Sequence, residues 1–324
     1  MMNHNPSGPS ECPVCRAPGA SFACQAVLYA GCEKDIFSCA GCGSSYYWPS
    51  PAPEDVARCY PYSYYGDFLK QYWKDFYKGR MLADSLAGWR GSGTFLDVGC
   101  ALGTLLAGFR ERSGWKVLGL EYSKEAAEAG SRLNGLTIAP GGLLDAPWPD
   151  RSVDYVHMNN VLEHESRPLE ALRAAARLLG PGGRLHLTLP NGPLDLRPTR
   201  VLYRRWGKAV VTRHGGHLFF FSKRSLGPLL ERAGLRLLTV KNFHFKSALK
   251  ARGWTPGAYR LFAAHLSPAP PRAEAPPLSS EECRARIGAP RSWPRYRLGA
   301  GWRRLWRLPF GEMGCDLEVF AEKS

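Results

Sequence analysis

The chain lacks a long apolar run. No segment of its 324 residues approaches the ~20 consecutive apolar residues that a membrane-spanning helix needs, and Met1–Ser10 carries no hydrophobic stretch of a secretory signal peptide. Acidic residues are scarce toward the C-terminus: residues 195–324 contain 25 Lys and Arg but only 9 Asp and Glu, a net charge of +16, whereas the rest of the chain nets −1. We therefore expect a cytoplasmic protein with a short disordered start and a positive field confined to its C-terminal part.

Cysteine is also scarce beyond residue 42, because six of the ten cysteines precede that point. Four of them form two C-x-x-C pairs separated by 23 residues. A tight turn within each pair can direct both thiolates at one ion, and two pairs complete a tetrahedral zinc site of the closed, structural kind. The alternative is a set of free thiols or a site that has lost its metal. Cys24 and Cys32 have no such partner, so the predicted zinc ligands are Cys12, Cys15, Cys39 and Cys42.

The stretch Thr94–Leu106 predicts a buried strand, a glycine turn and the start of a helix. It is apolar up to Asp97, turns through small residues and then becomes amphipathic. Gly99 and Gly103 allow a sharp turn and let a ligand approach the backbone N–H groups at the helix N-terminus. An ordinary strand–turn–helix would look the same, so the neighbouring segments decide what the motif means.

Three later segments fit one plan. A second apolar strand, Val117–Leu120, is followed by Glu121, 18 residues beyond the second glycine of the turn. An acid at this point can accept hydrogen bonds from both hydroxyls of a ribose. A further strand over residues 153–158 leads to Leu162-Glu163-His164, and a short helix leads to Pro181-Gly182-Gly183.

In this order the segments resemble a class I S-adenosylmethionine-dependent methyltransferase, over roughly residues 93–245 and the last ten. NAD and FAD enzymes share the first turn but lack the two later elements. The resemblance implies an α/β fold, a Rossmann-like sheet of seven strands whose last strand is antiparallel, with a small N-terminal zinc ribbon. The expected division is a zinc-ribbon-like module at 1–48, a Tyr-rich helical linker at 49–92, the methyltransferase domain at 93–245 and 314–324, and a basic, Pro-rich insertion at 246–313.

The resemblance also implies how S-adenosylmethionine is bound. Asp97 and the turn would hold the methionine portion, Glu121 the ribose hydroxyls, and Tyr122 would cover the adenine face. Ala101 replaces the commoner glycine of the motif, which is tolerable if its φ is negative. The predicted cofactor-binding residues are Asp97, Gly99, Ala101, Gly103, Glu121, Tyr122, Leu143, Asn159 and Asn160.

Adenine recognition departs from the family pattern. Many relatives carry an acid at the position of Gly142, and its absence here puts a side-chain contact in doubt. Backbone groups of Leu143 can still read the adenine edge, and Asp145 is a possible substitute acid.

An acceptor that carries a proton needs a general base. His164 follows the fourth strand, and His217 opens an H-L-x-x-F-S segment that relatives place over the substrate. In each case a loop histidine bonded to the backbone is the structural alternative, and His214 is a rival base. Glu163 is expected to hold the loop. The predicted catalytic residues are His164 and His217.

Two aromatic segments lie outside these motifs. In the linker, Tyr60–Tyr65 are candidates to close over the cofactor, while the helical aromatics after them are expected to pack on the catalytic domain. In the insertion, Trp302 and Trp306 share one helical face among arginines. One interpretation is that this segment contacts an anionic membrane peripherally. The alternative is that the tryptophans pack on the sheet, while the arginines line a phosphate site or face solvent.

Three functions fit these features. The first is methyl transfer to a small molecule, such as a glycan or secondary-metabolite intermediate. The second is RNA methylation, which the basic charge favours; however, Asn159-Asn160-Val161-Leu162 replaces an N-P-P-Y-type base-flipping motif, and the glycine-turn half is neutral. The third is a non-catalytic scaffold that binds the cofactor, which the intact motifs disfavour.

Overall fold

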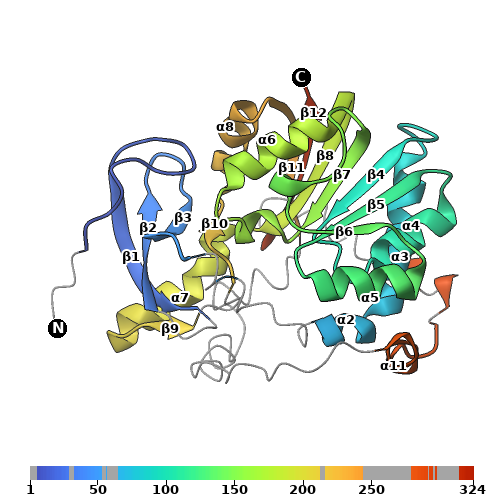
Figure 1. Ribbon diagram of the computed structural model, residues 1–324. Helices are drawn as coiled ribbons and strands as arrows, with labels where there is room; N and C mark the ends of the chain where they lie inside the picture. Colours follow the sequence, from blue (N-terminus) through green and yellow to red (C-terminus); the bar gives the residue numbers. More distant parts are fainter. Residues whose placement is uncertain are drawn as a thin grey trace.

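The larger of the two sheets has seven strands in the order β11-β12-β8-β7-β4-β5-β6 (Figure 1). The computed structural model describes residues 6–28, 33–52, 56, 65–211, 216–243, 279–290, 292–294, 296–297 and 314–324. Strands β4 to β8 run parallel, and β12 is antiparallel to its neighbours β8 and β11. The predicted seven-stranded sheet with an antiparallel last strand is confirmed. The strands are β4 Thr94–Val98, β5 Lys116–Glu121, β6 Ile138–Pro140, β7 Val153–Asn159, β8 Leu179–Pro190, β11 Leu235–Phe243 and β12 Asp316–Lys323.

Helices cover both faces of this sheet, as the apolar strands require. Phe95 and Tyr155 belong to the core cluster that α3, α4 and α5 share with the sheet, whereas Leu96 and Val156 belong to the cluster with α6 and α8. Alternate residues of one strand therefore face opposite helical layers. The helices are α3 Tyr72–Leu86, α4 Thr104–Arg112, α5 Lys124–Asn134, α6 Pro168–Leu178 and α8 Lys223–Arg232.

The α6–β8 junction is shorter than the sequence predicts. The run of Gly and Pro at 180–183 was expected to separate helix and strand, but β8 begins at Leu179 and contains that run. Leu179 pairs with Val153 of β7, and the register shifts before Arg184 pairs with Tyr155. The shift in register accommodates the glycines within β8, so β8 begins to pair with β7 at Leu179, before the glycine run.

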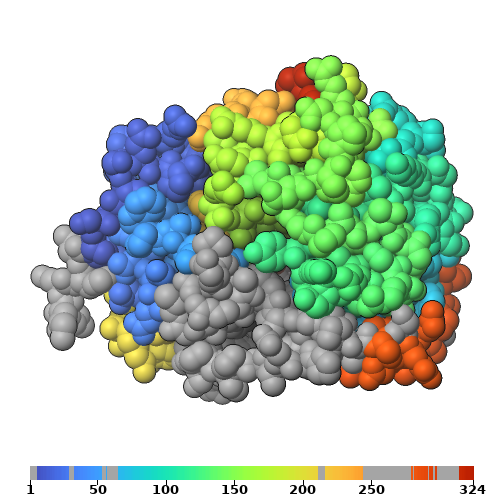
Figure 2. Space-filling model, viewed as in Figure 1, coloured from blue at the N-terminus to red at the C-terminus, as the bar shows by residue number. Residues whose placement is uncertain are grey.

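The smaller sheet joins the N-terminal segment to a distant part of the chain. Its order is β10-β3-β2-β1-β9, with β1 Ala20–Val27, β2 Glu33–Cys39, β3 Ser45–Trp48, β9 Val210–Val211 and β10 Phe219–Phe220. Tyr46 of β3 pairs with Phe219 of β10, and α7 (Gly192–Trp206) lies against β1. In the space-filling view the blue N-terminal residues touch the yellow-green and orange residues beside α6 and α8 (Figure 2). The ribbon therefore shares its sheet with the segment that follows α7.

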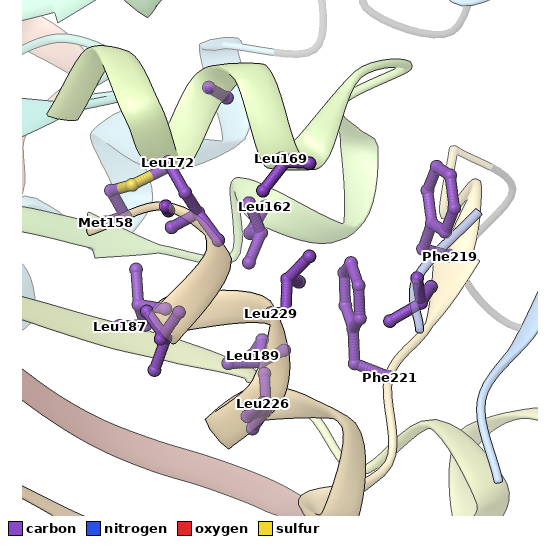
Figure 3. Close-up of a cluster of buried hydrophobic side chains, with 14 of the residues drawn as sticks. Met158, Leu162, Leu169, Leu172, Leu187, Leu189, Phe219, Phe221, Leu226 and Leu229 are labelled. Carbon is purple, nitrogen blue, oxygen red and sulfur yellow. The ribbon is translucent and has the colours of Figure 1, made fainter. Parts of the chain in front are cut away.

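A buried apolar cluster fixes the two segments that carry the predicted bases. Leu162, in the short helix η3 (Leu162–His164), packs with Leu169 of α6 and Leu229 of α8, and Phe221 lies beside them (Figure 3). Leu162, Leu229 and Phe221 are each 1% exposed or less. Residues 162 and 221 are thus anchored in one core, which limits how far Glu163, His164 and His217 can separate.

The linker adds helices to the cofactor side of the sheet. Helix α2 (Gly66–Lys70) lies near α11 (Ser280–Arg286), and α3 packs closely along α4. A Cβ at Gly108 would lie 1.9 Å from the carbonyl oxygen of Phe76, so only glycine permits this approach. The predicted packing of the linker's helical aromatics on the catalytic domain is thereby confirmed.

Only a few residues of the basic insertion are described. Trp293 packs on Tyr77 of α3, and the guanidinium of Arg80 lies over its ring at 4.5 Å. Trp302 and Trp306 lie outside the described residues, so their membrane contact stays a prediction. Among the helices that the structure describes, none is long and apolar enough to cross a membrane.

Candidate functional site

The four predicted zinc ligands converge on one point. Their sulfur atoms all lie within 4.8 Å of one another, with Cys12 Sγ 3.8 Å from Cys42 Sγ and Cys15 Sγ 3.6 Å from Cys39 Sγ. Four thiolates at ~2.3 Å from a tetrahedral zinc ion would lie about 3.8 Å apart. The cluster therefore fits the ion. Cys24 stands apart in β1, and burial raises the pKa of its thiol to about 12.

The two cysteine pairs are built alike. In the first, the N–H of Arg16 donates to the carbonyl of Cys12; in the second, the N–H of Gly43 donates to the carbonyl of Cys39. Arg16 and Gly43 both have positive φ, 65° and 74°. Arg16 thus holds in the first pair the same left-handed position that Gly43 holds in the second. The repeated turn directs both thiols of each pair inward.

The glycine turn brings the cofactor segment against the His164 segment. Gly99 has φ +66°, its N–H donates to the carbonyl of Leu120 at 2.7 Å, and a Cβ at this position would lie 2.6 Å from Cγ2 of Val161. Val161 lies two residues before Glu163. A side chain at residue 99 would force these two loops apart, so glycine links the turn to the residues that follow β7.

Ala101 departs from what the sequence led us to expect. Its φ is +50°, not negative, so the alanine occupies a backbone conformation that favours glycine. Its N–H donates to Oε2 of Glu121 at 2.8 Å. This hydrogen bond joins the turn to the end of β5.

Glu121 is buried at the carboxyl end of β5 and is fully engaged by its own chain. Oε1 accepts hydrogen bonds from the Tyr65 hydroxyl at 2.8 Å and from the Ser123 N–H at 3.0 Å. Burial raises the pKa of this carboxyl. The neighbouring Tyr122 is 65% exposed, as a ring that covers a ligand face requires. The fold thus places Tyr65 beside Glu121, the acid predicted to bind the ribose hydroxyls.

Asp97 is held by a histidine that the sequence analysis did not single out. His157 Nδ1 lies 2.7 Å from Asp97 Oδ1, and both side chains are 6% exposed. The two residues are direct partners in the β4–β7 register. Strand register is a tertiary property, so nothing in the sequence marked His157 for this position.

The remaining predicted cofactor residues lie at the same edge of the sheet. Asn159 ends β7 exposed, and Asn160 is exposed with φ +54°, its N–H donating to the carbonyl of Thr188. Leu143 is buried in helix η2 (Leu143–Asp145), and the N–H of Gly141 just before it donates to the carbonyl of Glu121. Their contacts with a cofactor stay predictions.

The two predicted catalytic histidines meet at Glu163. His164 Nε2 lies 3.8 Å and His217 Nε2 3.9 Å from Glu163 Oε1, and the two rings are 4.8 Å apart. Glu163 is 1% exposed, burial raises its pKa to about 7, and neither of its carboxylate oxygens has a hydrogen-bond partner among the described residues. The expectation that Glu163 holds the loop agrees with one contact, because its carbonyl accepts the N–H of Leu218 at 2.8 Å.

Each histidine is oriented through its other nitrogen. His164 Nδ1 lies 2.8 Å from the carbonyl oxygen of Gly216, and His217 Nδ1 lies 2.8 Å from Asp195 Oδ2. Asp195 lies in the first turn of α7, and nothing in the sequence pointed to it. Nδ1 therefore carries the proton of each neutral ring, and Nε2 is the atom that can accept one. The rival base, His214, lies outside the described residues.

The sheet order, the glycine turn and the acid at the end of the next strand define a class I S-adenosylmethionine-dependent methyltransferase. Residues 65–240, more than half of the chain, match the family described as "Methyltransferase domain". The chain therefore belongs to this family.

Relatives with different substrates share part of the sequence. Identity is 36% over 158 residues with an uncharacterized 37.1 kDa protein in transposon TN4556 of Streptomyces fradiae, 28% over 188 residues with 27-O-demethylrifamycin SV methyltransferase of Amycolatopsis mediterranei, and 30% over 139 residues with tRNA U34 carboxymethyltransferase of Desulfotalea psychrophila. These matches cover 45%, 50% and 41% of this chain and 44%, 68% and 43% of the relatives. The chain thus spans less than half the length of the first and third.

The solved structures that resemble the chain include geranyl diphosphate C-methyltransferase from Streptomyces coelicolor A3(2). It shares 16% identity and a TM-score of 0.42, over 75% of this chain and 80% of that one.

Proposed function

We propose that this methyltransferase acts on a small molecule, such as a glycan or secondary-metabolite intermediate, and that His164 and His217 form its acceptor side. The observation that supports this most is the convergence of two Nε2 atoms on Glu163, beside the glycine turn. One relative, 27-O-demethylrifamycin SV methyltransferase, acts on a small molecule by name, which agrees with this proposal.

S-adenosylmethionine would supply an electrophilic methyl group on sulfur. Asp97, the turn at 99–103, Glu121 and Tyr122 would hold it at the carboxyl ends of β4 and β5. His217, oriented by Asp195, would take the proton of an acceptor O–H or N–H as the acceptor atom bonds to the methyl carbon and the sulfur keeps the electron pair. The buried Glu163 would stabilise the resulting imidazolium. His164 would orient the acceptor or serve as the base in place of His217.

The four cysteines would bind a structural zinc ion. Two observations support this. The four sulfur atoms pack closely, and within the described residues the cluster contains cysteines alone. We further propose that residues 1–48 form the ribbon module, 49–92 the linker, 93–245 with 314–324 the catalytic domain, and 246–313 an insertion over it.

RNA is the second candidate acceptor, because the C-terminal part is basic and one relative is a tRNA-modifying enzyme by name. Transfer of label from methyl-tritiated S-adenosylmethionine separates the two. Incubation with a small-molecule extract and, separately, with total RNA should label only the small-molecule fraction, and the double variant His164→Gln/His217→Gln should abolish that label. Label confined to RNA would replace this proposal with the second. No label in either fraction, with intact cofactor binding, would favour the scaffold.

A further inference from the structure

The carboxyl group of Glu163 is buried beside two histidines that lie too far from it for a hydrogen bond. The side chain of Glu163 is 2% exposed, and no hydrogen bond to either oxygen is present in the part of the chain that the structure describes. A buried carboxylate is normally paired, hydrogen-bonded or bound to a metal ion. Two imidazole nitrogens, a type of atom that can bind a metal ion, lie 3.8 and 3.9 Å from Oε1.

The histidines present those nitrogens in the right form. The carbonyl of Gly216 can only accept a hydrogen bond, so Nδ1 of His164 donates to it and Nε2 keeps its lone pair. Asp195 fixes the same tautomer in His217. Metal-bound histidines characteristically donate their second ring N–H to a backbone carbonyl or a carboxylate. Both kinds of acceptor are present.

We propose that His164, His217 and Glu163 bind a divalent first-row transition-metal ion, through two Nε2 atoms and one carboxylate. Their donor atoms all lie within 4.8 Å of one another, and the two nitrogens lie 3.8 and 3.9 Å from the carboxylate oxygen. An ion bound at ~2.1 Å holds neighbouring ligands roughly 3.0–3.4 Å apart, so the two nitrogen–carboxylate distances need to shorten by about 0.4–0.9 Å. Two imidazoles and one carboxylate leave further coordination positions open.

This inference deepens the proposed function and rests on it for the position of the acceptor. With the ion bound, both Nε2 lone pairs are occupied. The ion, and not a bare imidazole, then contacts an oxygen of the acceptor and makes that oxygen easier to deprotonate. The site differs in chemistry from the four cysteines, because it offers nitrogen and oxygen ligands and no sulfur.

Cobalt(II) distinguishes the two sites in the full-length protein. Zinc-loaded protein titrated with Co²⁺ should bind one further ion per chain, with weak visible d–d bands and without the intense near-ultraviolet charge-transfer band of a cobalt thiolate. X-ray absorption of this ion should show a nitrogen/oxygen shell at about 2.0–2.1 Å and no sulfur. Calorimetry gives its affinity.

Variants test the ligand set. Glu163→Gln, which preserves volume, and His217→Ala should abolish the nitrogen/oxygen cobalt site, while the matched control Glu165→Gln, two residues away, should retain it. Asp195→Ala should weaken cobalt binding by about 10- to 100-fold, because Asp195 acts through His217. Calorimetry with S-adenosylmethionine checks that each variant is folded.

Two results would overturn the metal site: a cobalt spectrum containing thiolate bands only, or equal cobalt binding in wild type and Glu163→Gln. The wild-type absorption measurement decides the matter even if a variant does not fold. Methyl transfer is measured separately with labelled cofactor, in the presence and absence of added metal. Methyl transfer at full rate without the ion would overturn its part in the reaction and leave the histidines as bases, whereas the cobalt spectra decide whether the ion binds.

Discussion

The hydroxyl of Ser222 donates a hydrogen bond to the backbone carbonyl of Cys42, one of the four clustered cysteines. The N–H of Ser222 donates to Oγ of Ser44 at 3.1 Å, and Ser222 also caps α8 by accepting the N–H of Ser225. Five residues before it stands His217. The cysteine cluster is therefore connected to the segment that carries His217, a predicted base.

Replacing Ser222 should loosen the cysteine cluster. Ser222→Ala removes a helix cap, worth about 1 kcal/mol, and leaves the Cys42 carbonyl without this donor. We expect faster release of zinc to a chromophoric chelator and a lower midpoint in urea unfolding. Ser279→Ala is the matched control, because it removes the cap of α11 without touching the ribbon. Equal zinc release from both variants would show that the Ser222 contact is unimportant.

Removing zinc should affect the acceptor side more than the cofactor side. One zinc ion per chain is expected at the four cysteines, measured by elemental analysis and lost in Cys12→Ser/Cys42→Ser. After chelation, the backbone amide of Tyr47, which donates to the carbonyl of Leu218, should exchange its hydrogen faster. Affinity for S-adenosylmethionine should change little. Protein prepared without chelator that contains no metal would disprove the zinc site.

Cofactor affinity should depend on Asp97 and Glu121. Each alanine substitution removes a charged hydrogen-bonding group, and a loss of about 1–3 kcal/mol corresponds to roughly 5- to 150-fold weaker binding. Calorimetry measures this, with Asp84→Ala, a surface acid paired with Arg112, as a control. Circular dichroism should show that the sheet persists. Unchanged affinity in both variants would mean that the cofactor binds elsewhere.

Cofactor binding should weaken on mild acidification. Burial raises the pKa of Glu121 above its usual ~4.3. This carboxyl therefore contributes to the stability of the ligand-free fold below pH ~4.3, and that contribution is lost as the pH rises through the folded pKa. Ribose hydroxyls need the ionised form, so affinity should fall as the pH drops through the raised pKa. Calorimetry at a series of pH values, from neutral down to the lowest at which the protein stays folded, checks this; a flat profile in wild type would contradict it.

Tyr65 should compete with the cofactor for Glu121. Its hydroxyl and the Ser123 N–H already occupy Oε1, and the Ala101 N–H occupies Oε2, so a ribose diol must displace one donor. The tyrosine is the movable one, because the other two belong to the backbone. Tyr65→Phe should tighten S-adenosylmethionine binding by up to about fivefold, the value of one hydrogen bond near 1 kcal/mol. Weaker binding would instead make Tyr65 a part of the closed site.

The sequence alone determined the order of elements in this protein. Local patterns predicted the first sheet strands and the glycine turn, because an apolar run and a turn depend on neighbouring residues, and the antiparallel last strand came from the family resemblance. The two C-x-x-C pairs were visible for the same reason. Glu121 could be predicted as the ribose-binding acid because it ends the next strand, 18 residues after Gly103.

Only the tertiary structure decided which distant residues meet. The pairing of β4 with β7 put His157 against Asp97, and the start of α7 put Asp195 against His217. Ala101, whose φ is positive, bonds to Glu121, 20 residues away. The sharing of the ribbon's sheet with β9 and β10 also depends on strand register. Long-range pairing depends on how whole layers pack, and no local pattern of residues encodes that.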